Sequence, residues 1–235
     1  MTIIKELPNL MIYGGDDRKL TIIDVNSNEV ADIWQVEHTI NCIDGICVND
    51  GMFVLAVGCE DGFIRIRKNW EHVGKIYQFF GNKQILDIKF CNDPKEIIVC
   101  CEDKKVYFIS FDSNSNDYKI LPEKPPITFA SSFPFSMNFN LEHSKLLVNT
   151  YQSKFNLSKT SLNLVDINSH DFSDSIDQVE NIYWVNWETK YPINPKIVNI
   201  QSLSLSLASN HNFVIGSDEV NALHLWKGNK FLKQI

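Results

Sequence analysis

An acidic turn that follows a short apolar run recurs along the chain with a nearly constant spacing. It occurs at four places: Ile12–Asp17, Ala56–Asp61, Ile98–Asp103 and Val214–Glu219. Asp17 and Asp61 are 44 residues apart, and Asp61 and Asp103 are 42 residues apart. A fixed period of this length indicates one structural unit that is stacked repeatedly, because each unit buries its apolar face against its neighbours.

Alternation of apolar and polar residues in steps of two accompanies these turns. In Ser202–Leu207 every leucine falls on one face of a strand and every serine on the other. A further apolar run follows each turn: Leu20–Ile23, Phe63–Ile66, Val106–Ile109 and Leu223–Trp226. Matching runs, Ile40–Val48 and Ile85–Phe90, precede the second and third turns. Because no stretch shows sustained helical spacing, the sequence predicts an all-β protein.

Four short strands in a unit of about 40–45 residues are typical of a β-propeller blade. The interval between Asp103 and Glu219 is 116 residues, too long for one blade. We therefore expect a degenerate blade there, with strands around Phe133–Asn138, Lys145–Tyr151 and Ser161–Ile167. The sequence predicts a single propeller domain over 1–235 with about five blades. The expected units are 1–36, 37–80, 81–122, 123–195 and 196–235.

Propellers usually have about 4–8 blades, so five units form either a small closed ring or part of a larger one. The first unit has no clear innermost strand, because its only candidate, Thr2–Leu7, is interrupted by Lys5 and Glu6. We favour an incomplete propeller, or one completed by a partner or by further chain. Such a protein exposes an edge and is expected to associate.

Several short motifs stand where a WD repeat has its signatures. Glu37-His38-Thr39 before an apolar run is similar to the Gly-His opening, and Ile23-Asp24, Val165-Asp166 and Trp226-Lys227 resemble the Trp-Asp dipeptide. The chain thus resembles a divergent WD-repeat propeller over its whole length, although no unit has the complete set of His, Ser/Thr, Asp and Trp. The expected structural loop residues are His38, Asp61 and Asp103.

One segment, 166–195, stands apart from the repeat because acidic residues precede a cluster of aromatic residues. One interpretation is an outer strand with a long solvated loop. The other is a surface for a partner protein, since tryptophan and tyrosine anchor many interfaces. Its candidate residues are Trp184, Tyr191, Asp174 and Asp177. The spacing of Trp184 and Trp187 also resembles propellers of the echinoderm microtubule-associated-protein-like family.

Candidate catalytic groups are few. Asp44 and Asp87 lie at equivalent places in two expected inner strands, and paired carboxylates can hydrolyse glycosides. The six histidines and six cysteines show no metal-ligand spacing and no CxxC pair. Phosphate-loop, dinucleotide-binding and nucleophile-elbow motifs are absent. We therefore expect no catalytic site, no cofactor, no metal and no disulfide framework.

The charge and the apolar runs bear on partners and compartment. With 22 basic and 29 acidic residues the net charge is −7, which disfavours direct nucleic-acid binding. No run approaches the roughly 18 apolar residues of a membrane span, and the N-terminus lacks a signal-peptide pattern. We expect an intracellular protein, cytoplasmic or nuclear, without membrane contact.

These observations favour a non-enzymatic scaffold, a WD-repeat-like subunit that binds other proteins in a eukaryotic multiprotein complex. One alternative is a five-bladed glycan-processing enzyme that uses Asp44 and Asp87. Another is a microtubule-associated propeller protein.

Overall fold

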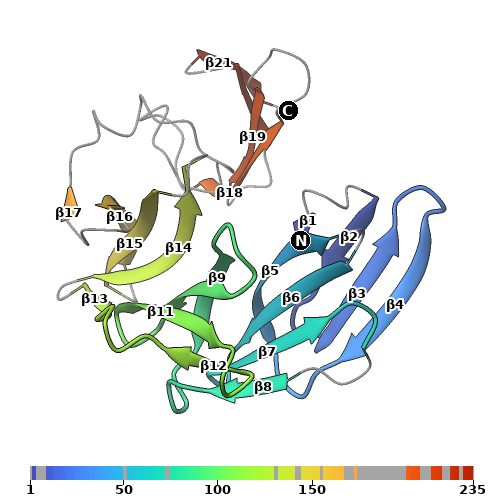
Figure 1. The fold of residues 1–235 in the computed structure, drawn as a ribbon. Coiled ribbons are helices and arrows are strands. Elements are labelled where there is room, and N and C mark those ends of the chain that lie inside the picture. The colour runs from blue at the N-terminus through green and yellow to red at the C-terminus, as the bar shows by residue number, and fades with distance from the viewer. Residues whose placement is uncertain are drawn as a thin grey trace. The chain divides into compact units, whose positions relative to one another are not determined.

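The computed structural model describes most of the first 166 residues and shorter parts of the remainder (Figure 1). The described residues are 2–3, 9–49, 52–71, 75–129, 132–140, 144–153, 156–166, 172–173, 200–206, 213–218, 223–227 and 230–234. Among them the regular elements are all strands, and none forms a helix that is long and apolar enough to cross a membrane. The prediction of an all-β protein is confirmed.

The strands within the described residues form five antiparallel sheets that follow one another along the chain. Sheet 1 consists of β1 (Thr2–Ile3), β2 (Leu10–Tyr13), β3 (Lys19–Asp24) and β4 (Glu29–Gln35). Sheet 2 consists of β5 (Ile40–Asn49), β6 (Met52–Cys59), β7 (Phe63–Lys68) and β8 (Lys75–Gln78). Sheet 3 consists of β9 (Ile85–Phe90), β10 (Glu96–Cys101), β11 (Lys105–Asp112), β12 (Asp117–Ile120) and β13 (Ile127–Thr128).

The last two sheets have four strands each. Sheet 4 consists of β14 (Phe133–Phe139), β15 (Lys145–Ser153), β16 (Asn156–Asp166) and β17 (Phe172–Ser173). Sheet 5 consists of β18 (Ile200–Ser206), β19 (Phe213–Asp218), β20 (Leu223–Lys227) and β21 (Lys230–Gln234). Each sheet is a meander in which consecutive strands pair. Of the strands in the described ranges, β13 alone departs from this order, since it pairs with β11 on the same side as β12.

The chain divides into two compact units, residues 1–135 and 136–235. The first contains sheets 1 to 3, and the second contains sheets 4 and 5 with most of β14. Sheet 1 has a first strand that the sequence shows only weakly: β1 pairs with β2 through two residues, Thr2 opposite Ile12 and Ile3 opposite Met11. The organisation of 1–235 as a single domain with the expected unit boundaries remains a prediction.

The repeated acidic turns join the second strand of a sheet to the third. In the first three turns the residue after the last aspartate has a positive φ: Arg18 at 60°, Gly62 at 81° and Lys104 at 69°. A tight hairpin requires this left-handed conformation, which glycine adopts without strain. The recurring motif is therefore the local chemistry of a hairpin that each sheet needs at the same place.

β6 shows why one strand reads as a continuous apolar run rather than an alternation. Phe53, Leu55, Val57 and Cys59 belong to the core shared with sheet 1, whereas Val54 and Ala56 belong to the core shared with sheet 3. A strand that is buried on both faces needs apolar residues at every position. Sheet 2 is thus packed between its two neighbours, and side chains from sheets 1 and 3 fill the two cores.

Candidate functional site

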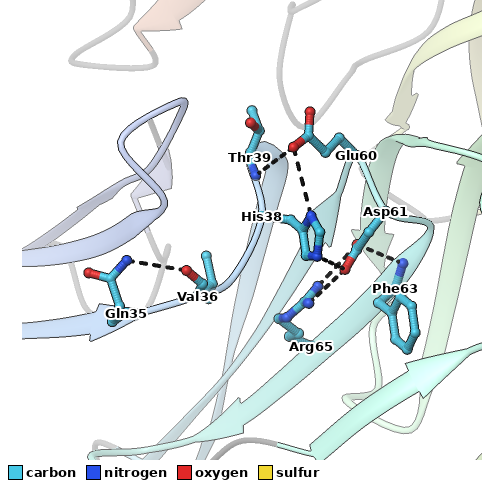
Figure 2. A network of polar contacts seen from close by, with 8 residues as sticks. All are labelled: Gln35, Val36, His38, Thr39, Glu60, Asp61, Phe63 and Arg65. Carbon is cyan, nitrogen blue, oxygen red and sulfur yellow. Dashed lines mark hydrogen bonds and ion pairs between the residues drawn. The ribbon is translucent and has the colours of Figure 1, made fainter.

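The first polar network joins the loop before β5 to the turn between β6 and β7 (Figure 2). His38 Nδ1 lies 3.9 Å from Glu60 Oε1, and His38 Nε2 lies 3.7 Å from Asp61 Oδ2. The Thr39 N–H donates to Glu60 Oε1 at 3.3 Å, and the Glu60 N–H donates to the Thr39 carbonyl at 3.1 Å. These contacts fasten the loop that enters sheet 2 to the turn of the same sheet.

Asp61 is the centre of this network. Its carboxylate accepts two bonds from the Arg65 guanidinium, at 3.2 and 2.7 Å, and one from the Phe63 N–H at 3.1 Å. Desolvation by burial acts to raise the pKa of Asp61. The bonds from Arg65 and Phe63, with the positive charges of Arg65 and His38, outweigh it and lower that pKa. The carboxylate is therefore held ionised, as a structural acceptor for the turn.

The equivalent turn in sheet 3 uses Asp103 with a different partner. Asp103 Oδ2 accepts a short hydrogen bond from the Tyr107 hydroxyl, and Lys105 Nζ lies 4.0 Å away. Tyr107 follows Asp103 by four residues, as Arg65 follows Asp61. Burial, and then the bond to Asp103, raise the pKa of Tyr107. The same spacing thus supports two different donors, a guanidinium in one sheet and a phenol in the next.

The two aspartates expected in inner strands lie in β5 and β9, where both bond to the backbone. Asp44 Oδ2 accepts the Phe90 N–H at 2.6 Å and so links sheet 2 to sheet 3. Asp87 Oδ1 accepts the N–H of the next residue at 2.9 Å, and Lys89 Nζ lies 3.9 Å from that oxygen. No group of three or more metal-ligating side chains occurs among the residues that the structure describes.

The buried ion pair between sheets 1 and 2 was not predicted from the sequence. The Arg67 side chain in β7 is 1% exposed and forms a short ion pair with Asp32 in β4. Its guanidinium carbon lies 5.7 Å from the centre of the Trp34 ring. Arg67 stands directly opposite Leu55, a core residue. An arginine on the core face of a strand is the signal that could have revealed the pair, because a buried charge needs a partner.

The cysteines of the described chain are free thiols. Burial is the main cause that raises the pKa of Cys59 to about 11 and that of Cys91 and Cys101 to about 12. Burial also raises the pKa of Cys42 and Cys100 well above the ordinary value. These five buried thiols are protonated at neutral pH, and they serve as small apolar side chains.

The residues expected to contact a partner, Trp184, Tyr191, Asp174 and Asp177, lie outside the described residues, as does Trp187. Their role as an interaction surface remains a prediction.

Comparisons with known proteins identify the fold class of this chain. No protein-family model matches the chain, and no curated protein matches its sequence. Among solved structures it is similar to the β-propeller domain of Cps50 (Swd1) from Myceliophteria thermophila, with a TM-score of 0.67 at 11% identity. The match covers 100% of this chain and 85% of that one. The chain therefore has a β-propeller fold, which confirms the fold class expected from the repeat.

Proposed function

We propose that this chain is a divergent WD-repeat-like propeller that acts as a non-enzymatic scaffold, a subunit that binds other proteins in a eukaryotic multiprotein complex. The observation that carries the proposal is the match of the whole chain to a β-propeller domain. Stacked sheets form a rigid framework whose connecting loops can vary, and such loops are where binding residues are found. We expect the protein inside the cell, in the cytoplasm or the nucleus.

The contacts of the charged side chains support a scaffold over an enzyme. Asp44 accepts a backbone N–H of the neighbouring sheet, and Asp87 accepts the N–H of the next residue in its own strand. A general acid or nucleophile needs a carboxyl oxygen that can reach a substrate. These carboxylates instead satisfy the donors of the framework.

The test is isolation of the tagged chain at its natural expression level, followed by native mass spectrometry of the purified material. We expect a stoichiometric protein partner and no turnover of a panel of glycosides. Matched Trp184→Ala and Trp187→Ala variants, isolated in the same way, report whether the aromatic segment holds that partner.

Two outcomes would replace the proposal. Recovery of the chain alone, together with glycoside hydrolysis that Asp44→Asn abolishes, would favour the glycan-processing alternative. Co-sedimentation of the purified chain with polymerised tubulin, with no other partner recovered, would favour the microtubule-associated alternative.

A further inference from the structure

Three strands at sheet edges share an arrangement in which an aspartate bonds the backbone N–H of the next residue. The strands are β4, at one edge of sheet 1, and β9 and β12, at the two edges of the four-strand path of sheet 3. The bonds are Asp32 Oδ1 to Ile33 N at 2.8 Å, Asp87 Oδ1 to Ile88 N at 2.9 Å and Asp117 Oδ1 to Tyr118 N at 3.1 Å.

The direction of the Ile33 N–H follows from the register of β3 and β4. In an antiparallel pair, hydrogen-bonded and non-hydrogen-bonded residue pairs alternate. The Val36 N–H donates to the Arg18 carbonyl at 2.9 Å, and Thr21 stands opposite Ile33 three steps further along. Thr21 and Ile33 are therefore a non-hydrogen-bonded pair. The Ile33 N–H points away from β3, out of the open edge of the sheet.

The same alternation applies to β12. The Leu121 N–H donates to the Phe108 carbonyl at 3.0 Å, and Tyr118, three steps along β12, stands opposite Phe111. Tyr118 therefore belongs to a non-hydrogen-bonded pair. Its N–H points out of the edge of sheet 3, where Asp117 accepts it.

The same alternation of hydrogen-bonded and non-hydrogen-bonded pairs holds in β9. The Cys91 N–H donates to the Glu96 carbonyl at 2.9 Å, so the N–H groups of Phe90 and Ile88 both point away from β10. The Phe90 N–H is indeed bonded from outside the sheet, by Asp44 of β5. The outward N–H of Ile88 is accepted by its own neighbour in the chain.

A cation lies beside each of these carboxylates. Arg67 forms its ion pair with Asp32, Lys89 Nζ lies 3.9 Å from Asp87 Oδ1, and Lys75 Nζ lies 4.0 Å from Asp117 Oδ1. Arg67 and Lys75 belong to sheet 2 and thus approach from a neighbouring sheet. A nearby positive charge restricts the orientation of a carboxylate, so the acceptor stays over the outward N–H.

We propose that Asp32 and Asp117 block the addition of a further strand at β4 and β12. The edge of β9 is already covered, because side chains of β5 bond its Phe90 N–H and its Ile85 carbonyl. An incoming strand must place a carbonyl oxygen where the carboxylate oxygen already lies, and two oxygens repel at that distance. Unpaired edge strands otherwise recruit other chains. Partners of this propeller therefore bind to its loops rather than by extending β4 or β12.

β8, the outer edge of sheet 2, shows a different protection. It has four residues and begins with Lys75, so it is both short and charged, which are two features that discourage strand addition. The aspartate arrangement occurs on β4, which has seven residues, and on β12, which has four, so it does not depend on the length of the strand.

The experiment compares Asp117→Ala with Asp117→Asn in the full chain. The Asp117 side chain is 49% exposed, so neither change threatens the fold. Asparagine keeps an oxygen that can accept the Tyr118 N–H, whereas alanine removes it. Sedimentation velocity over a wide concentration range measures self-association, and hydrogen exchange measures protection of the Tyr118 amide.

We expect Asp117→Ala to associate with itself at least about tenfold more strongly than Asp117→Asn and to exchange the Tyr118 amide faster when dilute. Asp117→Asn should match the unmodified protein in both measurements. Equal sedimentation of the two variants would overturn the proposal. So would equal self-association of both variants above that of the unmodified protein, because the charge rather than the hydrogen bond would then protect the edge.

Discussion

Replacement of Asp32 by asparagine tests how sheets 1 and 2 are held together. Arg67 is 1% exposed, its ion-pair partner is Asp32, and arginine stays charged in proteins. Asparagine retains an oxygen for the Ile33 N–H, so the substitution removes the charge and keeps the bond at the strand edge. The loss of stability in Asp32→Asn therefore reports the buried guanidinium left without its counter-ion.

The expected loss of stability follows from the exposure of the Asp32 and Arg67 side chains. Removal of one member of a buried ion pair costs about 3–5 kcal/mol. The Asp32 side chain is 22% exposed, so water partly screens the pair, and we expect the lower end, about 3 kcal/mol. Arg67→Met leaves a carboxylate that water can still reach and replaces the buried charge with an apolar chain. We expect that variant to cost about 1 kcal/mol.

Urea unfolding, followed by circular dichroism and by tryptophan fluorescence, measures these differences. The double variant with Asp32→Asn and Arg67→Met should be about as stable as Arg67→Met alone, because the asparagine no longer faces a charge. A loss below about 1 kcal/mol in Asp32→Asn would refute the reasoning, since the pair would then behave as a surface salt bridge. Additive losses in the double variant would also refute it, because they would show that the two groups do not interact.

Three further predictions concern packing, pH and the aromatic segment. Gly58→Ala should cost about 1–3 kcal/mol in urea unfolding, because a Cβ there overlaps the side chains of Ile85 and Cys42, whereas Gly15→Ala meets nothing nearby and should stay within about 0.5 kcal/mol. The pKa of Asp61 is lowered from 3.8 in the folded state, so the stabilisation by its carboxylate is present above pH 3.8 and disappears as the pH falls through the folded-state pKa. Asp61→Asn should therefore unfold more easily at neutral pH and lose less stability on acidification. An unchanged dependence of stability on acid pH in this variant would contradict the prediction. Trp187→Ala should lower the melting temperature at a cost of about 3–5 kcal/mol, and Trp184→Ala should weaken partner binding by about 2 kcal/mol with the fold intact; the reverse pattern would exchange the two roles.

The sequence predicts those features that depend on near neighbours in the chain. The hairpins after Asp17, Asp61 and Asp103 need a residue with positive φ at one fixed place, so their spacing reveals the repeat and through it the fold. β1 is a weaker case: Thr2 and Ile3 pair with β2 although Lys5 and Glu6 interrupt the candidate strand. Its pairing depends on β2 rather than on its own composition.

The ion pair of Asp32 with Arg67 could not be predicted in the same way. The two residues are 35 positions apart, and they meet only because sheet 1 packs on sheet 2. Asp44 and Asp87 make the same point, since they are equivalent in sequence but bond differently: one bonds the next sheet and the other its own strand. Contacts between sheets depend on how the sheets stack and on the register of their strands. Neither can be derived from a single sequence.

Many aspartates of this chain are bonded to the backbone, and this bears on the origin of its net negative charge. Among the described residues, five aspartates accept a backbone N–H two residues further on, at turns: Asp17, Asp24, Asp61, Asp93 and Asp112. Three more accept the outward N–H of an edge strand, and Asp44 joins two sheets. A propeller of short strands has many turns and edges, and each leaves donors that the ladders cannot satisfy. The excess of acidic over basic residues therefore follows in part from this architecture. The short side chain of aspartate places its carboxylate within reach of nearby backbone N–H groups. A partner surface should accordingly be sought where charged side chains are not already bonded to the backbone.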